Sequence, residues 1–290
     1  MTSLVITDTN TRQESNRRSA SFAMGNSVSS SCHRLEKGLM MHFHSLSLNG
    51  QHATLTELLS KSKKGDKISC MITDPRCMGM FYELESRGAD IFPPLLSQSL
   101  SLSKVHQALH FMDYMIPSTQ VLFRTSNIHK LLRRYGERSI VKTVVKEDRG
   151  SMGMGGHPCW SLNELAWAIV HVTPFPVVVQ PMLDDFREFR LVVMGETVVA
   201  KEKIGSDGLF WNNRIFGGVT KLIDPTKEMV EFGKEVMRIG KFPWAYIDLF
   251  VTDADTFVSE INLSGSNAGM KDYKLNTLKR EMIERWLADG

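Results

Sequence analysis

The sequence is poor in cysteine, has no excess of one charge and lacks a long apolar run. Its 4 cysteines among 290 residues form no C-x-x-C pair, which argues against a disulfide framework or a zinc ribbon and favours a reducing compartment. Lys and Arg number 35 against 32 Asp and Glu, a net charge of +3. Because positive and negative charges are nearly balanced, neither nucleic acid nor an anionic membrane is expected as the main partner.

No apolar stretch reaches the roughly 18 residues that a membrane helix needs. The longest candidate, residues 162–183, is broken by Glu164, His171, Pro174 and Pro176. The first residues are polar and hold no apolar signal-peptide core. We therefore expect a cytoplasmic protein without a membrane partner. Hydrophobic residues make up 42% of the chain, enough for one large core or two modest ones, and we expect two domains.

Short β-branched runs alternate with helical patterns in the first hundred residues, which predicts a small parallel α/β unit. Strands are expected at 4–7, 41–48 and 68–73, with a helix between Asp74-Pro75 and Gly88. Pro93-Pro94 and the serine-rich run 97–103 predict a domain boundary near residue 97.

Beyond this boundary, helices and antiparallel hairpins predominate. Helices are expected at 104–115, 128–135, 161–171, 224–239 and 275–287, and single strands at 120–123, 139–145 and 177–180. Hairpins are expected at 191–200, around Gly195-Glu196, and at 245–262. The fold class is therefore α/β followed by α+β.

The last hairpin carries the most informative polar residues. Glu260 and Asn262 are two residues apart on one strand and share a face, and a tight hairpin brings Asp248 on the neighbouring strand to the same side. Hard oxygen ligands without His or Cys suit Mg²⁺. A solvated polar face on a half-exposed hairpin is the alternative interpretation.

A second candidate segment joins a strand to a glycine-rich loop. Lys142 lies in an apolar strand, and Gly153, Gly155 and Gly156 belong to the loop 150–156. Backbone N–H groups of such a loop can close on phosphate oxygens, and a strand lysine is costly unless it meets an anion. The loop matches neither the Walker pattern nor G-x-G-x-x-G. An edge-strand lysine beside a flexible loop is the alternative.

A third segment follows the strand that ends near Gln180. Backbone groups between Gln180 and Leu183 can bind an adenine edge, while Glu188 reaches a ribose hydroxyl and Arg190 an anion. Alone, this segment is equally typical of a charged loop.

Together these segments resemble the ATP-grasp superfamily, and most closely its RimK-like amino-acid ligases, over nearly the whole chain. The motif A-Y-I-D ending at Asp248 and the motif E-I-N from Glu260 to Asn262 are similar to the family's metal signature. The hairpin from Glu188 and the stretch from Asn213 to Gly217-Gly218 are similar to its long middle hairpin. Lys104 and Lys142 match its two nucleotide lysines.

The resemblance implies a pre-ATP-grasp α/β domain at 1–97 and an ATP-grasp domain at 98–290, with subdomains at 98–180 and 181–290. It further implies that ATP and Mg²⁺, or alternatively Mn²⁺, bind between these subdomains. The metals would lie on Asp248, Glu260 and Asn262. The nucleotide would lie on residues of the middle segments, namely Lys104, Lys142, Gly153, Gly155, Gly156, Gln180, Leu183 and Glu188.

The implied chemistry is activation of a carboxylate as an acyl phosphate, followed by attack of an amine to give an amide, ADP and phosphate. Arg190 and Lys142 would be catalytic, and Arg190, Asn213 and Arg214 would contact the substrate. The partners would be an amino acid or another carboxylate and an amine acceptor that is a small molecule, a peptide or a protein. A homo-oligomer is left open.

Three positions depart from the family pattern. Pro181 follows Gln180 where the family commonly has an acidic residue, Ile215-Phe216 replace a His-Arg pair, and the family's Pro after E-x-N is absent. The replacement of the His-Arg pair disfavours glutamate as the substrate. Together with Pro181, it keeps open a second function, that of a nucleotide-binding or regulatory protein that forms no amide. A nucleic-acid-binding module built on the basic helix at 128–138 is the third.

Overall fold

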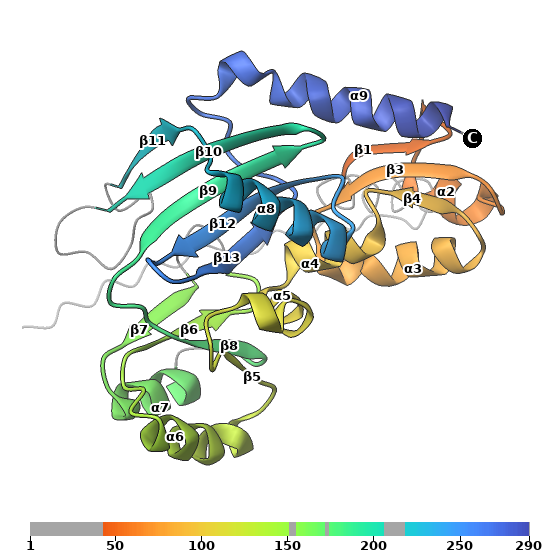
Figure 1. The fold of residues 1–290 in the computed structure, drawn as a ribbon. Coiled ribbons are helices and arrows are strands. Elements are labelled where there is room, and N and C mark those ends of the chain that lie inside the picture. The colour runs from red at the N-terminus through yellow and green to blue at the C-terminus, as the bar shows by residue number, and fades with distance from the viewer. Residues whose placement is uncertain (1–42, 151–154, 172–173, 206–217, 290) are drawn as a thin grey trace, which may run out of the picture. The chain divides into compact units, whose positions relative to one another are not determined.

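The computed structural model describes residues 43–150, 155–171, 174–205 and 218–289 (Figure 1). All of them belong to one compact unit, Leu39–Gly290. The strand expected at 4–7 lies outside the described residues.

The first sheet is mixed. Its strands lie in the order β2, β1, β3, β4, with bounds Gln51–His52, Phe43–Leu48, Lys67–Ile72 and Asp90–Phe92. Among these described strands only β3 and β4 pair in parallel, whereas β1 runs antiparallel to β2 and β3. The reversal comes from Asn49-Gly50, which link β1 to β2 with φ angles of 48° and 80°. Asn-Gly with positive φ favours a tight hairpin turn.

Two helices pack on this sheet. Helix α2, Leu55–Lys61, begins at a capping box in which Thr54 and Glu57 exchange hydrogen bonds. Helix α3, Met78–Ser86, follows a 3-10 turn at Pro75–Cys77, and Gly88 with φ of 90° follows its end, as expected. Buried side chains of both helices and of β3 form the core of this part of the chain.

The serine-rich run is helical rather than a connecting segment. Helix α4, Leu95–Leu102, contains all of it except Ser103, so the boundary expected near residue 97 falls inside a helix. Gln98 explains the burial of this polar run, because its carboxamide accepts from Ile72 N at 2.8 Å and donates to Pro93 O at 2.7 Å. Helix α5, Lys104–His110, begins directly after Ser103.

The second sheet is antiparallel and carries helices on one face. Its order is β5, β8, β6, β7, with bounds Gln120–Leu122, Val177–Pro181, Thr143–Glu147 and Gly156–Cys159. Helices α6, Ile128–Glu137, and α7, Leu162–His171, pack against its apolar face. The strand expected at 139–145 is shifted to β6 because α6 extends past Tyr135 and Ser139 adopts a φ of 55°.

The third sheet is antiparallel and holds the two predicted hairpins. Its order is β11, β10, β9, β12, β13, with bounds Val219–Ile223, Thr197–Ile204, Arg187–Met194, Trp244–Val251 and Thr256–Asn262. Helix α8, Lys227–Gly240, begins at Thr226, whose hydroxyl accepts from Met229 N at 3.3 Å. It packs closely on β9, because a Cβ at Gly233 would lie 2.4 Å from Leu191. Helix α9, Leu275–Ala288, also packs against this core.

Mixed α/β architecture with several sheets is the fold class that the sequence predicts. None of the helices within the described ranges is both long and apolar enough to span a membrane.

Candidate functional site

One face of the third sheet carries a row of charged residues from four adjacent strands. In the strand register Lys201 on β10 lies opposite Arg190 on β9, Arg190 opposite Asp248 on β12, and Asp248 opposite Glu260 on β13. Directly opposed residues of antiparallel strands project to the same face. The register therefore places Asp248 and Glu260 on one side of the last hairpin, as the sequence predicts, with Asn262 two residues further along.

Asp248 lies at the centre of this row and is held by two cations. Arg190 binds it in a bidentate manner, with Nε to Oδ1 and Nη2 to Oδ2 both at 2.7 Å, and Lys203 Nζ donates to Oδ2 at 2.8 Å. The Asp248 residue is only 4% exposed. Burial raises the pKa of this carboxyl, but Lys203 and Arg190 outweigh burial and hold the pKa well below its usual range.

Lys203 links Asp248 to a second carboxylate. Its Nζ donates to Glu188 Oε1 at 2.6 Å as well as to Asp248, so a buried lysine bridges β9 and β12. Burial lowers the pKa of Lys203, but the two carboxylates reverse the effect and raise it. Lys203 was not predicted from the sequence, because the expected hairpin ended at residue 200 whereas β10 extends to Ile204. The available signal was its alternation with Lys201, since residues two apart on a strand share a face.

Lys104 reaches the same site from the first position of α5. Its Nζ lies 3.0 Å from Glu260 Oε1 and also donates to the carbonyl of Gly150. Asp148 fixes the start of this helix, because its Oδ1 accepts from Ser103 Oγ at 2.6 Å and from Val105 N at 3.0 Å. The predicted Lys104 is thus brought to a predicted metal ligand.

Lys146 on β6 is a second lysine at the site, and sequence analysis missed it. Its Nζ donates to Ser259 O at 3.4 Å and lies 5.7 Å from the centre of the Phe250 ring. Burial and the charge of Lys104 lower the pKa of Lys146 to about 8, although Glu260 and other carboxylates oppose this shift. The sequence did contain a signal for Lys146: it lies four residues before Gly150 and is therefore closer to the glycine run than Lys142 is.

Lys142 lies directly before β6 and has a different partner. Its Nζ binds Asp184 Oδ1 at 2.5 Å, and both side chains are largely exposed, at 46% and 74%. Lys142 is four positions before Lys146, which corresponds to about 13 Å along an extended chain. Its predicted role at the nucleotide stays a prediction.

The neck of the glycine loop is unusually narrow. Gly150 and Gly155 approach so closely that a Cβ on either would lie 2.5 Å from the Cα of the other. Glu147 N donates to Gly155 O at 2.7 Å and ties the neck to β6. Only glycine fits both positions, which explains part of the G-rich pattern.

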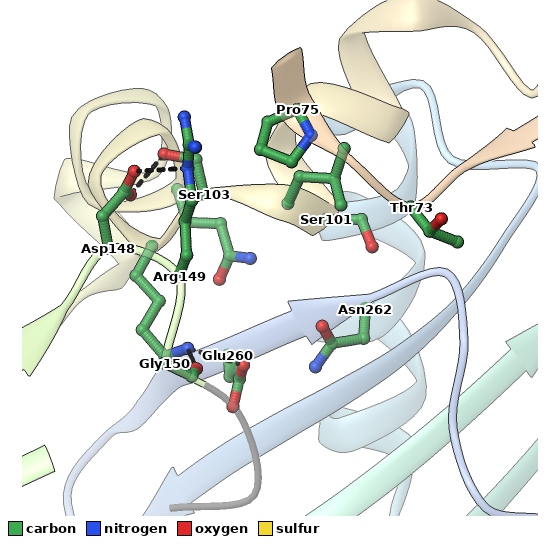
Figure 2. A pocket seen from close by; sticks show the side chains of 12 residues that line it. Thr73, Pro75, Ser101, Ser103, Asp148, Arg149, Gly150, Glu260 and Asn262 are labelled. Carbon is green, nitrogen blue, oxygen red and sulfur yellow. Dashed lines mark hydrogen bonds and ion pairs between the residues drawn. The ribbon is translucent and has the colours of Figure 1, made fainter. Parts of the chain in front are cut away.

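A cavity of about 300 Å³ opens beside these groups (Figure 2). Glu260 and Asn262 lie at its base, and Ser103, Asp148, Arg149 and Gly150 line one side. Thr73, Pro75 and Ser101 line the other, and Leu102, Lys104 and Gln107 complete the lining. The first sheet, the glycine loop and the last hairpin thus contribute to one hollow.

The RimK-like ATP-grasp domain family matches residues 102–286, well over half of the chain. The chain belongs to this family. The match includes every charged side chain described above, from Lys104 to Glu260. No curated protein sequence matches the chain significantly.

Solved ATP-grasp ligases share the fold of this RimK-like protein. D-alanyl-alanine synthetase A from Vibrio cholerae is 17% identical, with 74% of each chain covered and a TM-score of 0.56. D-alanine–D-alanine ligase from Bacillus anthracis complexed with ATP is 18% identical, with 71% and 74% of the chains covered and a TM-score of 0.54. The D-cycloserine synthetase DcsG is 15% identical, covering 72% and 78%, also with a TM-score of 0.54.

Of the remaining predicted residues of this RimK-like chain, the structure describes Gln180, Leu183 and Gly156. Gln180 is 2% exposed and donates through Nε2 to Thr119 Oγ1 at 3.4 Å, while its Oε1 has no partner among the described residues. Leu183 is half-buried after β8, and Gly156 begins β7. Gly153, Asn213 and Arg214 lie outside the described residues.

The donor set fits a hard divalent cation such as Mg²⁺. Glu260 is 30% exposed in its side chain, and the Asn262 carboxamide faces the cavity without a hydrogen bond from the described residues. Both offer oxygen donors. Asp248 fits less directly, because Arg190 and Lys203 occupy its two oxygens. No group of three His, Cys, Asp or Glu side chains suited to a metal occurs in the described part of the chain.

Proposed function

We propose that this protein is an ATP- and Mg²⁺-dependent carboxylate–amine ligase that forms an amide through an acyl phosphate. The observation that carries the proposal is the meeting of Lys104, Lys146, Arg190 and Lys203 with Glu188, Asp248 and Glu260 beside a cavity. Membership of the family supports the class of ligase, and these residues would bind the nucleotide, the metal and the acyl phosphate.

The charge of this site favours a polyanion. Four cationic side chains, those of Lys104, Lys146, Arg190 and Lys203, lie among only three carboxylates. Lys201, which is only 6% exposed, adds a further buried ammonium group in the same row. Buried cations without matching anions are costly. A triphosphate would neutralise this excess, with Lys104 and Lys146 on its phosphate oxygens and Glu188 on the ribose.

We infer that the nucleotide lies between the second sheet and the third, the subdomains expected at 98–180 and 181–290. Lys146 on β6 already contacts the backbone of Ser259 on β13 across this junction. Lys146 is therefore our candidate for the second nucleotide lysine, in place of Lys142. The Gln180 Oε1, which has no partner in the described part of the chain, is a buried acceptor on β8, the strand next to that of Lys146.

Glu260 and Asn262 would hold the metal. Asp248 would join them if the metal replaced Arg190 or Lys203 at one of its oxygens. Bound there, Mg²⁺ would neutralise charge on the transferred phosphoryl group. Arg190 and Lys104 are each held by a carboxylate, Asp248 and Glu260, and these two carboxylates lie opposite each other in the strand register. Arg190 would stabilise the acyl phosphate.

The reaction balances without a protein nucleophile. A carboxylate oxygen attacks the γ-phosphorus, the bond from that phosphorus to the β,γ-bridging oxygen breaks, and ADP leaves. The amine nitrogen then attacks the acyl carbon, the C–O bond to phosphate breaks, and phosphate leaves as the amine loses a proton to solvent. Positioning and charge carry the first step.

Product analysis tests this proposal. We expect enzyme, ATP and Mg²⁺ with mixed amino acids and amines to yield ADP and a condensation product of equal amount by mass spectrometry. Glu260→Gln should abolish both products. Asp253→Asn, in the exposed turn of the same hairpin, is the matched control and should retain both.

A second candidate function is nucleotide binding without amide formation. The observation that favours it is the closed contact of Asp248 with Arg190 and Lys203, which leaves that carboxylate without an open oxygen. Measurable ATP binding with no phosphate release for any carboxylate and amine would support this function and contradict the ligase.

A further inference from the structure

The cavity beside Glu260 has one wall that the nucleotide residues do not explain. Thr73 and Pro75 come from the segment after β3, on the first sheet, and face Arg149 and Gly150 across the hollow (Figure 2). Glu260 and Asn262 lie at its base. A molecule in this cavity would therefore touch the proposed metal ligands Glu260 and Asn262, whereas Lys146 is not one of the lining residues.

Charge favours an acid over an amine in this cavity. Oδ1 of Asp148 already accepts hydrogen bonds from Ser103 and Val105, and Glu260 is paired with Lys104. Arg149 is different: its side chain is 60% exposed, and its one ion pair among the described residues, with Asp148 Oδ2, is long at 3.7 Å. A guanidinium has five donors, so Arg149 keeps most of them for a ligand.

The walls favour a small hydrophilic molecule. Thr73, Ser101 and Asn262 contribute polar groups, whereas Pro75 and Leu102 are the apolar members, and the described lining residues include no aromatic ring. A volume of about 300 Å³ is at the small end of the range for ligand pockets. A long or aromatic acid would meet polar groups that it could not pair.

We propose that this cavity binds the carboxylate substrate, that this substrate is a small hydrophilic acid, and that Arg149 and Thr73 select it. The inference rests on the proposed ligase function. Arg149, next to Gly150, holds the carboxylate near the proposed phosphate site. Thr73, on the opposite wall, contacts the far end of the acid and limits its length.

Hydroxylamine tests the inference without knowledge of the amine acceptor. It attacks an acyl phosphate at the acyl carbon and releases phosphate, so each activated acid gives a hydroxamate that can be measured by colour. With ATP and Mg²⁺ we expect hydroxamates from glycerate, L-serine or L-alanine, and none from L-phenylalanine or octanoate. Turnover of the large apolar acids alone would overturn the inference.

Variants assign the two residues. Arg149→Met should raise KM for the best acid roughly ten- to hundred-fold and leave KM for ATP unchanged. Arg149→Lys should recover part of the loss, and Arg133→Met, at an arginine 76% exposed on α6, should change neither constant. Thr73→Leu should reduce hydroxamate formation from longer acids more than from shorter ones. An unchanged KM for the acid in Arg149→Met would overturn the assignment.

The outcomes separate the two proposals. Hydroxamate formation with the same acid preference in wild type, Arg149→Met and Thr73→Leu would refute the inference and leave the ligase intact. No hydroxamate from any acid, with ATP binding confirmed by calorimetry, would refute the ligase and the inference together. Thermal denaturation of each variant shows whether it is folded.

Discussion

Arg190 and Asp248 form a bidentate ion pair across adjacent strands of the third sheet, with both N···O distances at 2.7 Å. The pair is a direct consequence of register, because β9 and β12 place the two residues opposite each other. Lys203 completes the contact from β10. A predicted metal ligand is therefore also the residue that fixes the guanidinium proposed to stabilise the acyl phosphate.

Breaking this pair should cost stability. Arg190→Met leaves Asp248 buried with Lys203 as its remaining cation, and we expect the free energy of unfolding to fall by about 3–5 kcal/mol. Urea denaturation measures this change. Arg187→Met, on the same strand as Arg190, removes a largely exposed arginine that pairs with Glu202 on β10 and should cost about 1 kcal/mol or less. Equal losses in the two variants would contradict the buried role.

Lys146 and Lys142 should differ as ligands of ATP. Lys146→Met removes a half-buried charge at the site and should weaken ATP binding by about 1.5–3 kcal/mol, roughly ten- to hundred-fold in Kd. Lys142→Met removes an exposed partner of Asp184 and should change Kd only slightly. Isothermal titration calorimetry gives both values. The reverse order would restore Lys142 as the nucleotide lysine.

The glycine-loop neck should not tolerate a side chain. Gly155→Ala places a Cβ 2.5 Å from the Gly150 Cα, so the backbone must shift, and we expect ATP affinity to fall at least tenfold. Gly79→Ala on α3 is the control, since nothing lies within 4 Å of the added Cβ. It should leave Kd unchanged and slightly raise stability. Unchanged ATP binding in Gly155→Ala would contradict a phosphate role for the neck.

Lys279 on α9 should make stability depend on alkaline pH. Burial lowers its pKa from 10.5 to about 8, although its ammonium group lies over the Tyr246 ring and donates to Leu263 O. Between these two pH values the unfolded chain binds more protons than the folded chain, so the free energy of unfolding should rise with pH.

The measurement for Lys279 is urea denaturation from pH 7.5 to 10. We expect the stability of wild type to rise across this range relative to that of Lys279→Met. Lys227→Met, at a lysine 83% exposed, controls for the loss of an ammonium group. A constant difference between wild type and Lys279→Met would contradict the burial of this charge.

Local patterns predicted the third sheet well. The turn at Gly195 and the polar alternation of the last hairpin fix which residues are opposed, so Asp248 and Glu260 could be brought together from sequence. Such pairs depend on neighbouring strands alone. The first sheet was predicted less well, because the hairpin signal of Asn49-Gly50 was missed.

Contacts between distant segments were beyond the sequence. Lys203 and Lys146 meet Asp248 and Ser259 only after the strands pair and the sheets face each other. Gln98 buries a serine-rich helix through partners on β3 and near β4, which no local pattern shows. Arg149 gained a candidate role only when Thr73, 76 positions earlier in the chain, was found across the same cavity.

An isotope transfer experiment tests the central claim most directly. A carboxylate substrate labelled with ¹⁸O in both oxygens is incubated with enzyme, ATP, Mg²⁺ and an amine, and the released phosphate is analysed by mass spectrometry. An acyl phosphate intermediate predicts one ¹⁸O atom in each phosphate formed, because the carboxylate oxygen leaves with the phosphoryl group. Unlabelled phosphate accompanying amide formation would contradict the account.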